Sequence, residues 1–129
     1  MSSAVGDQLD PLSVVINREM IAAYAVASGD TNPIHLDEDF ARSVGLPGVI
    51  AHGMLQMGLL ASYLSQWSGS GGRLGRLRCR FSGMVEAGDS LTFGGRVLAV
   101  SDDQVSLEVW ALNQKGEKVL SKGEASIRI

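Results

Sequence analysis

The segment His52–Trp67, HGMLQMGLLASYLSQW, lies in the middle of the chain and decides how the other segments must pack. It holds no Asp, Glu, Lys or Arg, and neither does the longer stretch from Ser43 to Gly72. A membrane-spanning helix needs about 20 predominantly apolar residues, whereas this run is shorter and contains Gln56 and Ser62. The pattern therefore predicts a helix that is buried on nearly all sides within a soluble fold.

The residues before this helix predict a short strand and two further helices. Leu12–Ile16 is rich in β-branched residues, which favour a strand. Asn17 is a good helix N-cap and Gly29 is a good left-handed helix end, so we expect a helix between them. A shorter helix is expected from Asp37 to Gly45.

The residues after the helix predict four strands. Beyond the flexible connector Ser68–Gly72, strand patterns cover residues 73–81, 91–100, 105–112 and 119–129. Short turns join them, so we expect an antiparallel meander with a β-bulge at Gly94-Gly95. A long central helix wrapped by a curved antiparallel sheet is the economical packing of these pieces. The predicted fold class is α+β, in a single domain covering residues 1–129.

Composition and charge exclude several classes of protein. The 129 residues carry 11 Lys and Arg against 14 Asp and Glu, a net charge of −3, and 45% are hydrophobic. This balance argues against nucleic-acid binding, which needs a dense basic face. A single cysteine, Cys79, excludes an internal disulfide and a multi-cysteine zinc site. The first residues show no secretory signal, so we expect a cytoplasmic protein without membrane association.

The connector after the first long helix holds a carboxylate and an imidazole five residues apart. Its sequence is SGDTNPIH, residues 28–35. Pro33 fixes its own φ angle and pushes Asn32 toward extended geometry, so the connector is stiff. The side chains of Asp30 and His35 could therefore reach the same water molecule. Two proton-transfer groups near one water are what the addition of water to a carbon–carbon double bond, or its removal, requires. The alternative is ordinary turn chemistry, with His35 as a structural residue.

The start of the apolar helix is a second candidate for chemistry. If the helix begins at His52 or Gly53, its first amides lack partners and carry the positive end of the helix dipole. Gly53 has no side chain, so a ligand oxygen can approach its amide as in an oxyanion site. The alternative is a plain helix start, where glycine serves packing.

These motifs match a family signature. YxxxSGDxNPIH at residues 24–35, followed by HGM at 52–54, resembles the MaoC-like hydratase signature of (R)-specific enoyl-CoA hydratases and related dehydratases. Further similarities at residues 5–7, 80–81 and 88–89 extend the resemblance over nearly the whole chain. It implies a hot-dog fold and a hydro-lyase acting on 2-enoyl thioesters of coenzyme A or acyl carrier protein. It also implies that no metal or cofactor is needed and that the protein is a homodimer.

The resemblance implies roles for single residues. Asp30 and His35 would hold and deprotonate the attacking water and return a proton to C2, with the division between acid and base left open. The Gly53 amide would polarise the thioester carbonyl. The predicted substrate-binding residues are Asn32, which would also support the connector, His52, Met54 and Tyr63. Met54 and Tyr63 would serve equally well as core residues.

Alternatives remain for both the function and the arginines. The chain could act alone, as the catalytic subunit of a heteromeric (3R)-hydroxyacyl-ACP dehydratase, or as a non-catalytic module that binds acyl thioesters. A basic row on one predicted strand could meet the phosphates of coenzyme A or an acidic carrier protein, or could simply be a solvated edge. That row consists of Arg73, Arg76, Arg78 and Arg80.

Overall fold

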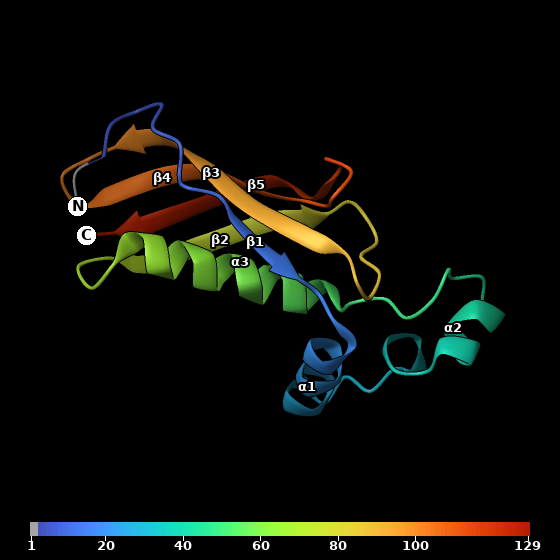
Figure 1. Ribbon diagram of the computed structural model, residues 1–129. Helices are drawn as coiled ribbons and strands as arrows, with labels where there is room; N and C mark the ends of the chain where they lie inside the picture. Colours follow the sequence, from blue (N-terminus) through green and yellow to red (C-terminus); the bar gives the residue numbers. More distant parts are fainter. Residues whose placement is uncertain (1–2) are drawn as a thin grey trace.

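The computed structural model describes residues 3–129 and confirms the predicted α+β class, with a long helix against an antiparallel sheet. The elements in chain order are β1 (Leu12–Val15), α1 (Arg18–Ser28), the 3₁₀ turn η1 (Pro33–His35), α2 (Glu38–Ser43), α3 (Gly53–Ser68), β2 (Arg73–Phe81), β3 (Ser90–Val100), β4 (Gln104–Leu112) and β5 (Lys118–Arg128). Helix α3 runs along the sheet, whereas α1 and α2 stand beyond one of its ends (Figure 1). None of the described helices combines the length and apolarity needed to cross a membrane.

Local signals set the ends of the helices as predicted. Oδ1 of Asn17 accepts a hydrogen bond from the amide of Met20 at 2.8 Å and so caps α1. Gly29 closes the same helix with a left-handed φ of 78°. Asp37 caps α2 by accepting from the amide of Phe40 at 3.0 Å. These caps determine where the connector between α1 and α2 begins and ends.

The strand order corrects one prediction. All pairings are antiparallel, and the order is β1-β3-β4-β5-β2. Strands β3, β4 and β5 form the expected meander, but β2 pairs with β5 instead of β3, with Leu77 opposite Ala125. Residues 82–89 are therefore a crossing connection and not a hairpin turn. Alternation in a sequence shows which face of a strand is buried, but it does not show which strand lies beside it.

The predicted bulge at Gly94-Gly95 is also wrong. Both glycines pair in regular register with β4, and the shift in this strand pair falls between Val97 and Ala99. Gly94 instead makes room for a large neighbour, because a Cβ there would come within 2.6 Å of the indole nitrogen of Trp110. The small residue serves packing across the sheet.

Gly123 lets β5 approach β4 closely, and we expect Gly123→Ala to destabilise the fold. The added Cβ would overlap the carbonyl oxygen of Val109 and lie 2.8 Å from its Cγ2. Overpacking of this kind costs about 1–3 kcal/mol, so the urea midpoint should fall clearly. Gly75→Ala on β2 is the control, because its Cβ would meet nothing closer than 3.5 Å. Equal midpoints for the two variants would contradict the close approach of β4 and β5.

One face of α3 is exposed, which corrects the prediction of a helix buried on nearly all sides. Leu60 and Leu64 are fully buried, whereas Met54, Gly58 and Ser62 on the other side are exposed. A single sheet contacts only one side of a helix, and no other element of the described chain covers the remaining side. The exposed side begins beside the predicted site, at Met54.

Candidate active site

The turn η1 holds the ring of His35 in one tautomer. Oδ1 of Asn32 accepts from the amide of Ile34 at 3.2 Å and so caps the turn. Nδ1 of His35 lies 2.7 Å from the carbonyl oxygen of Ile50, in the segment that leads into α3. A carbonyl oxygen only accepts, so Nδ1 carries the proton. The neutral ring of His35 therefore offers a lone pair at Nε2, which is the form needed to accept a proton.

Asp30 faces the same nitrogen. One carboxylate oxygen, Oδ1, accepts from the amide of Asn32 at 3.3 Å, which forms a short Asx turn. The other, Oδ2, lies 4.0 Å from Nε2 of His35. This distance is too long for a direct hydrogen bond but suits one water that donates to both groups. The Asp30 side chain is 53% exposed, so water reaches it freely.

His52 is buried against both of these groups. Its ring stacks on the ring of His35, with centroids 3.7 Å apart and planes at 23°. Its Nε2 lies 3.0 Å from the carbonyl oxygen of Asp30, and Tyr24 meets the ring edge-on at 4.8 Å. The side chain is thus enclosed by the residues that surround the connector.

Gly53 is the first residue of α3, with His52 as its N-cap. Within residues 3–129, the amide of Gly53 donates no hydrogen bond to the protein, as expected at the first position of a helix. A Cβ at this position would lie 3.3 Å from the ring of Phe81. Glycine therefore keeps an unpaired amide, at the positive end of a 16-residue helix, open beside that ring.

A hollow of about 480 Å³ joins these groups. Its lining consists of Tyr24, Ser28, Asp30, His35, His52, Gly53, Met54 and Phe81. Met54 and Phe81 are 56% and 50% exposed and form an apolar wall. Sequence reasoning missed Phe81 as a site residue. The available signal was its place after Leu77 and Cys79 in the alternating apolar pattern of β2.

The structure places Asn32 and Tyr63 outside this hollow. Asn32 uses its Oδ1 to cap η1, and so it supports the connector that carries Asp30 and His35. Tyr63 lies in the core, 6% exposed, where its hydroxyl donates to the carbonyl oxygen of Asp10 at 2.7 Å. Of the predicted site residues, Asp30, His35, His52, Gly53 and Met54 come together around the hollow.

Tyr63 provides a pH-dependent test of this placement. Burial, and secondarily the charge of Asp10, raise the pKa of Tyr63 from 10.0 to about 12. The unfolded chain therefore ionises first as pH rises, and Tyr63 contributes stability below pH 10 that is lost between about pH 10 and 12. Tyr63→Phe should lower the free energy of unfolding by about 1 kcal/mol at neutral pH. In urea titrations, the difference in free energy of unfolding between Tyr63→Phe and the parent protein should be smaller at pH 11 than at neutral pH. An equal difference at both pH values would contradict the buried, hydrogen-bonded hydroxyl of Tyr63.

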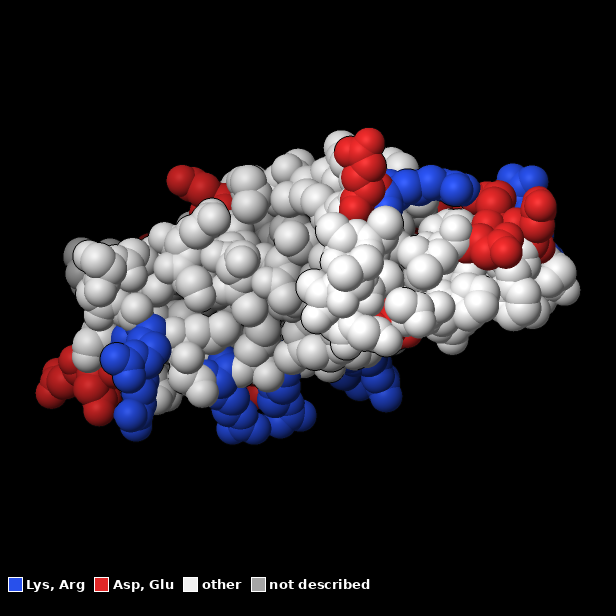
Figure 2. Space-filling view, turned by 90° about the horizontal axis from the view of Figure 1, so that it is seen from below, with Lys and Arg blue, Asp and Glu red and all other residues white. Residues whose placement is uncertain are grey.

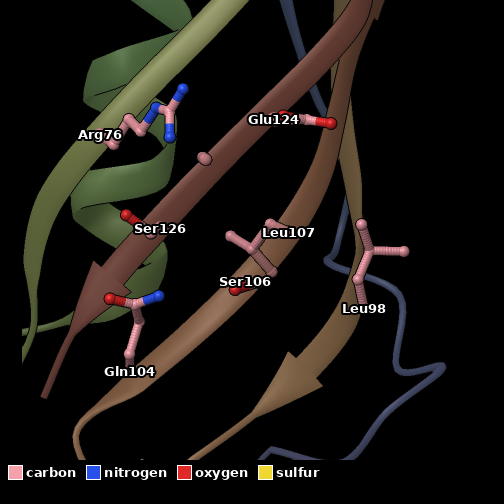
Figure 3. A pocket seen from close by; sticks show the side chains of 8 residues that line it. Arg76, Leu98, Gln104, Ser106, Leu107, Glu124 and Ser126 are labelled. Carbon is pink, nitrogen blue, oxygen red and sulfur yellow. The ribbon is translucent and has the colours of Figure 1, made fainter.

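A second hollow of about 380 Å³ lies on the sheet and shares no lining residue with the first. Arg76, Ser126 and Glu124 line one part of it, on β2 and β5 (Figure 3). Its lining contains no imidazole and no helix N-terminus, so it does not combine the carboxylate, imidazole and backbone amide that surround the first hollow.

The predicted basic row faces solvent. Arg73, Arg76, Arg78 and Arg80 are all exposed on β2, and Figure 2 shows basic side chains spaced along one long edge of the molecule. Arg78 lies 3.8 Å from Glu124, an ion pair exposed on both sides. Cys79 points the other way, and burial raises the pKa of its thiol, which disfavours the nucleophilic thiolate.

The fold and this hollow together define the class of protein. It is a hot-dog fold in which a carboxylate, an imidazole and a helix N-terminus surround one hollow. These groups suit acid–base chemistry on a compound whose carbonyl is polarised. Comparison with known proteins identifies the family. The chain belongs to the MaoC-like hydratase/dehydratase family, because residues 1–119 match the family model described as MaoC like domain.

Three similar proteins differ in size and in the function that their names describe. A solved structure described as an (R)-hydratase from A. caviae involved in PHA biosynthesis is 31% identical, with a TM-score of 0.91 over 99% of this chain and 98% of that one. The 3-oxo-4,17-pregnadiene-20-carboxyl-CoA hydratase beta subunit of Mycobacterium tuberculosis is 28% identical over 98% of both chains. The fatty acid synthase beta subunit TOXC of Cochliobolus carbonum is 32% identical over 92% of this chain, which spans only 6% of that protein.

Proposed function

We propose that this chain adds water to trans-2-enoyl thioesters of coenzyme A or acyl carrier protein, forming (R)-3-hydroxyacyl thioesters, and catalyses the reverse dehydration. The observation that carries the proposal is the 4.0 Å separation of Asp30 Oδ2 and His35 Nε2, with Nδ1 of His35 already bonded to the carbonyl of Ile50. Membership of the MaoC-like family and the similarity to an (R)-hydratase support it.

The proton transfers follow from this pair. A water between Asp30 and His35 donates one hydrogen bond to each group, which directs an oxygen lone pair at C3 of the substrate. As the new C–O bond forms, one of the two groups takes a proton from the water. A proton then returns to C2, so that H and OH have been added across the double bond. Side chains of this kind contribute about 10²–10⁴-fold each to such reactions.

The Gly53 amide stabilises the charge that develops. Attack at C3 moves electrons toward the thioester oxygen and produces an enolate. An unpaired amide at the start of α3 stabilises that oxygen by a hydrogen bond and by the helix dipole. Met54 and Phe81 supply an apolar wall beside the reacting atoms, suited to an acyl chain.

The direct test is product formation. The purified protein is incubated with crotonyl-CoA and with longer trans-2-enoyl-CoAs and enoyl carrier proteins, and 3-hydroxyacyl thioesters are measured by mass and by chiral separation. We expect a gain of one water and the (R) product. Binding without turnover on every substrate would instead favour the non-catalytic thioester-binding alternative.

A second candidate is a catalytic subunit that needs a different partner chain. The observations that favour it are the exposed face of α3 at Met54 and the similarity to a protein named as a beta subunit. In either case this chain would supply Asp30 and His35. Light scattering on the active fraction from size-exclusion chromatography separates the two cases. An active homodimer, which the family resemblance favours, excludes an obligatory different partner.

A further inference from the structure

His52, the N-cap of α3, contacts both Asp30 and His35. Its Nε2 reaches the carbonyl oxygen of Asp30, 22 residues earlier in the chain, at 3.0 Å. Because that oxygen only accepts, Nε2 carries the proton of the neutral ring. The same ring stacks on His35 at 3.7 Å. One buried side chain thus contacts the backbone of one proton-transfer residue and the ring of the other.

The remaining nitrogen of His52 shows that packing alone does not explain the residue. Nδ1 is buried and has no hydrogen-bond partner within residues 3–129, and the residue is only 3% exposed. An unsatisfied buried polar atom is costly and rare in folded proteins. An apolar ring would fill the space between Tyr24 and His35 without that cost. The donor at Nε2 is what an apolar ring would lack.

We infer that His52 is a positioning residue for the hydration reaction, and not a substrate ligand. It holds the carbonyl of Asp30 with its N–H and the plane of His35 with its ring, and so maintains the 4.0 Å gap in which the water is held. This inference rests on the proposed function. Misplacement of reacting groups by about 1 Å costs about 10²-fold in rate, so a residue that sets this gap affects catalysis strongly.

Two variants separate the two contacts. His52→Gln keeps an N–H donor but loses the ring, and His52→Phe keeps a ring but loses the donor. We expect each to lower kcat by about 10–100-fold, while KM changes by less than about threefold, because neither contact is made to substrate. Ile127→Val, a fully buried change on β5 away from the hollow, is the control for lost stability and should keep the parent kcat.

The outcomes distinguish the inference from the proposed function. A parent protein without hydratase activity contradicts the function. An active parent with unchanged kcat in both His52 variants, or with a change in KM alone, contradicts only the role of His52. Nitrogen NMR of the parent protein tests the geometry without activity and also covers variants that fail to fold. We expect His52 protonated at Nε2 and His35 at Nδ1. Protonation of His52 at Nδ1 would overturn the inference.

Discussion

Asp30→Asn is expected to lower kcat for crotonyl-CoA hydration by about 10²–10⁴-fold, with KM nearly unchanged. The amide has the shape of the carboxylate, so Asn32 and the connector keep their hydrogen bonds. The amide cannot take or return a proton. Its NH₂ group would donate a hydrogen bond at the place where the carboxylate accepts one from the water. Dehydration of (R)-3-hydroxybutyryl-CoA should fall by the same factor, because both directions share one transition state.

The control for this variant is Asp102→Asn. Asp102 lies in the exposed turn between β3 and β4, and its side chain makes no hydrogen bond within residues 3–129. The charge change is identical, so the control removes any general effect of net charge. Full activity in Asp30→Asn would end the assignment of Asp30 to proton transfer. Equal losses in both variants would point to charge and not to position.

Gly53→Pro is expected to lower kcat by about 10²–10³-fold, the usual effect of removing one oxyanion donor. Proline is well tolerated at the first position of a helix, where the missing N–H has no partner within the helix. The preceding residue, His52, already has the extended ψ of 138° that proline requires. The substitution therefore deletes the amide hydrogen and leaves α3 able to form.

Gly53→Ala is the matched control for this variant. It places the same Cβ near Phe81, at 3.3 Å, but it keeps the amide hydrogen. The comparison of kcat between the proline and alanine variants isolates the donor from the crowding. If both lose activity equally, the contact with Phe81 and not the amide explains the loss, and the oxyanion role of Gly53 is contradicted.

The connector shows how much of the site is predictable. Asn17, Gly29 and Asp37 cap their helices through contacts within four residues, and such local signals are visible in a sequence. They delimit a short stiff segment, so the proximity of Asp30 and His35 could be expected. The ring of Phe81 and the carbonyl of Ile50 reach the site from other segments, and no local pattern announces them.

Helix caps and apolar periodicity act over a few neighbouring residues, so the helices, the strands, their order along the chain and the residue types at the site are predictable without a structure. Four features have no such local signal: the pairing of β2 with β5, the exposed face of α3, the tautomer of His35 set by Ile50, and the stacking of His52 on His35. Each of these depends on contacts between distant segments, and such contacts arise from packing of the whole chain and not from any local pattern.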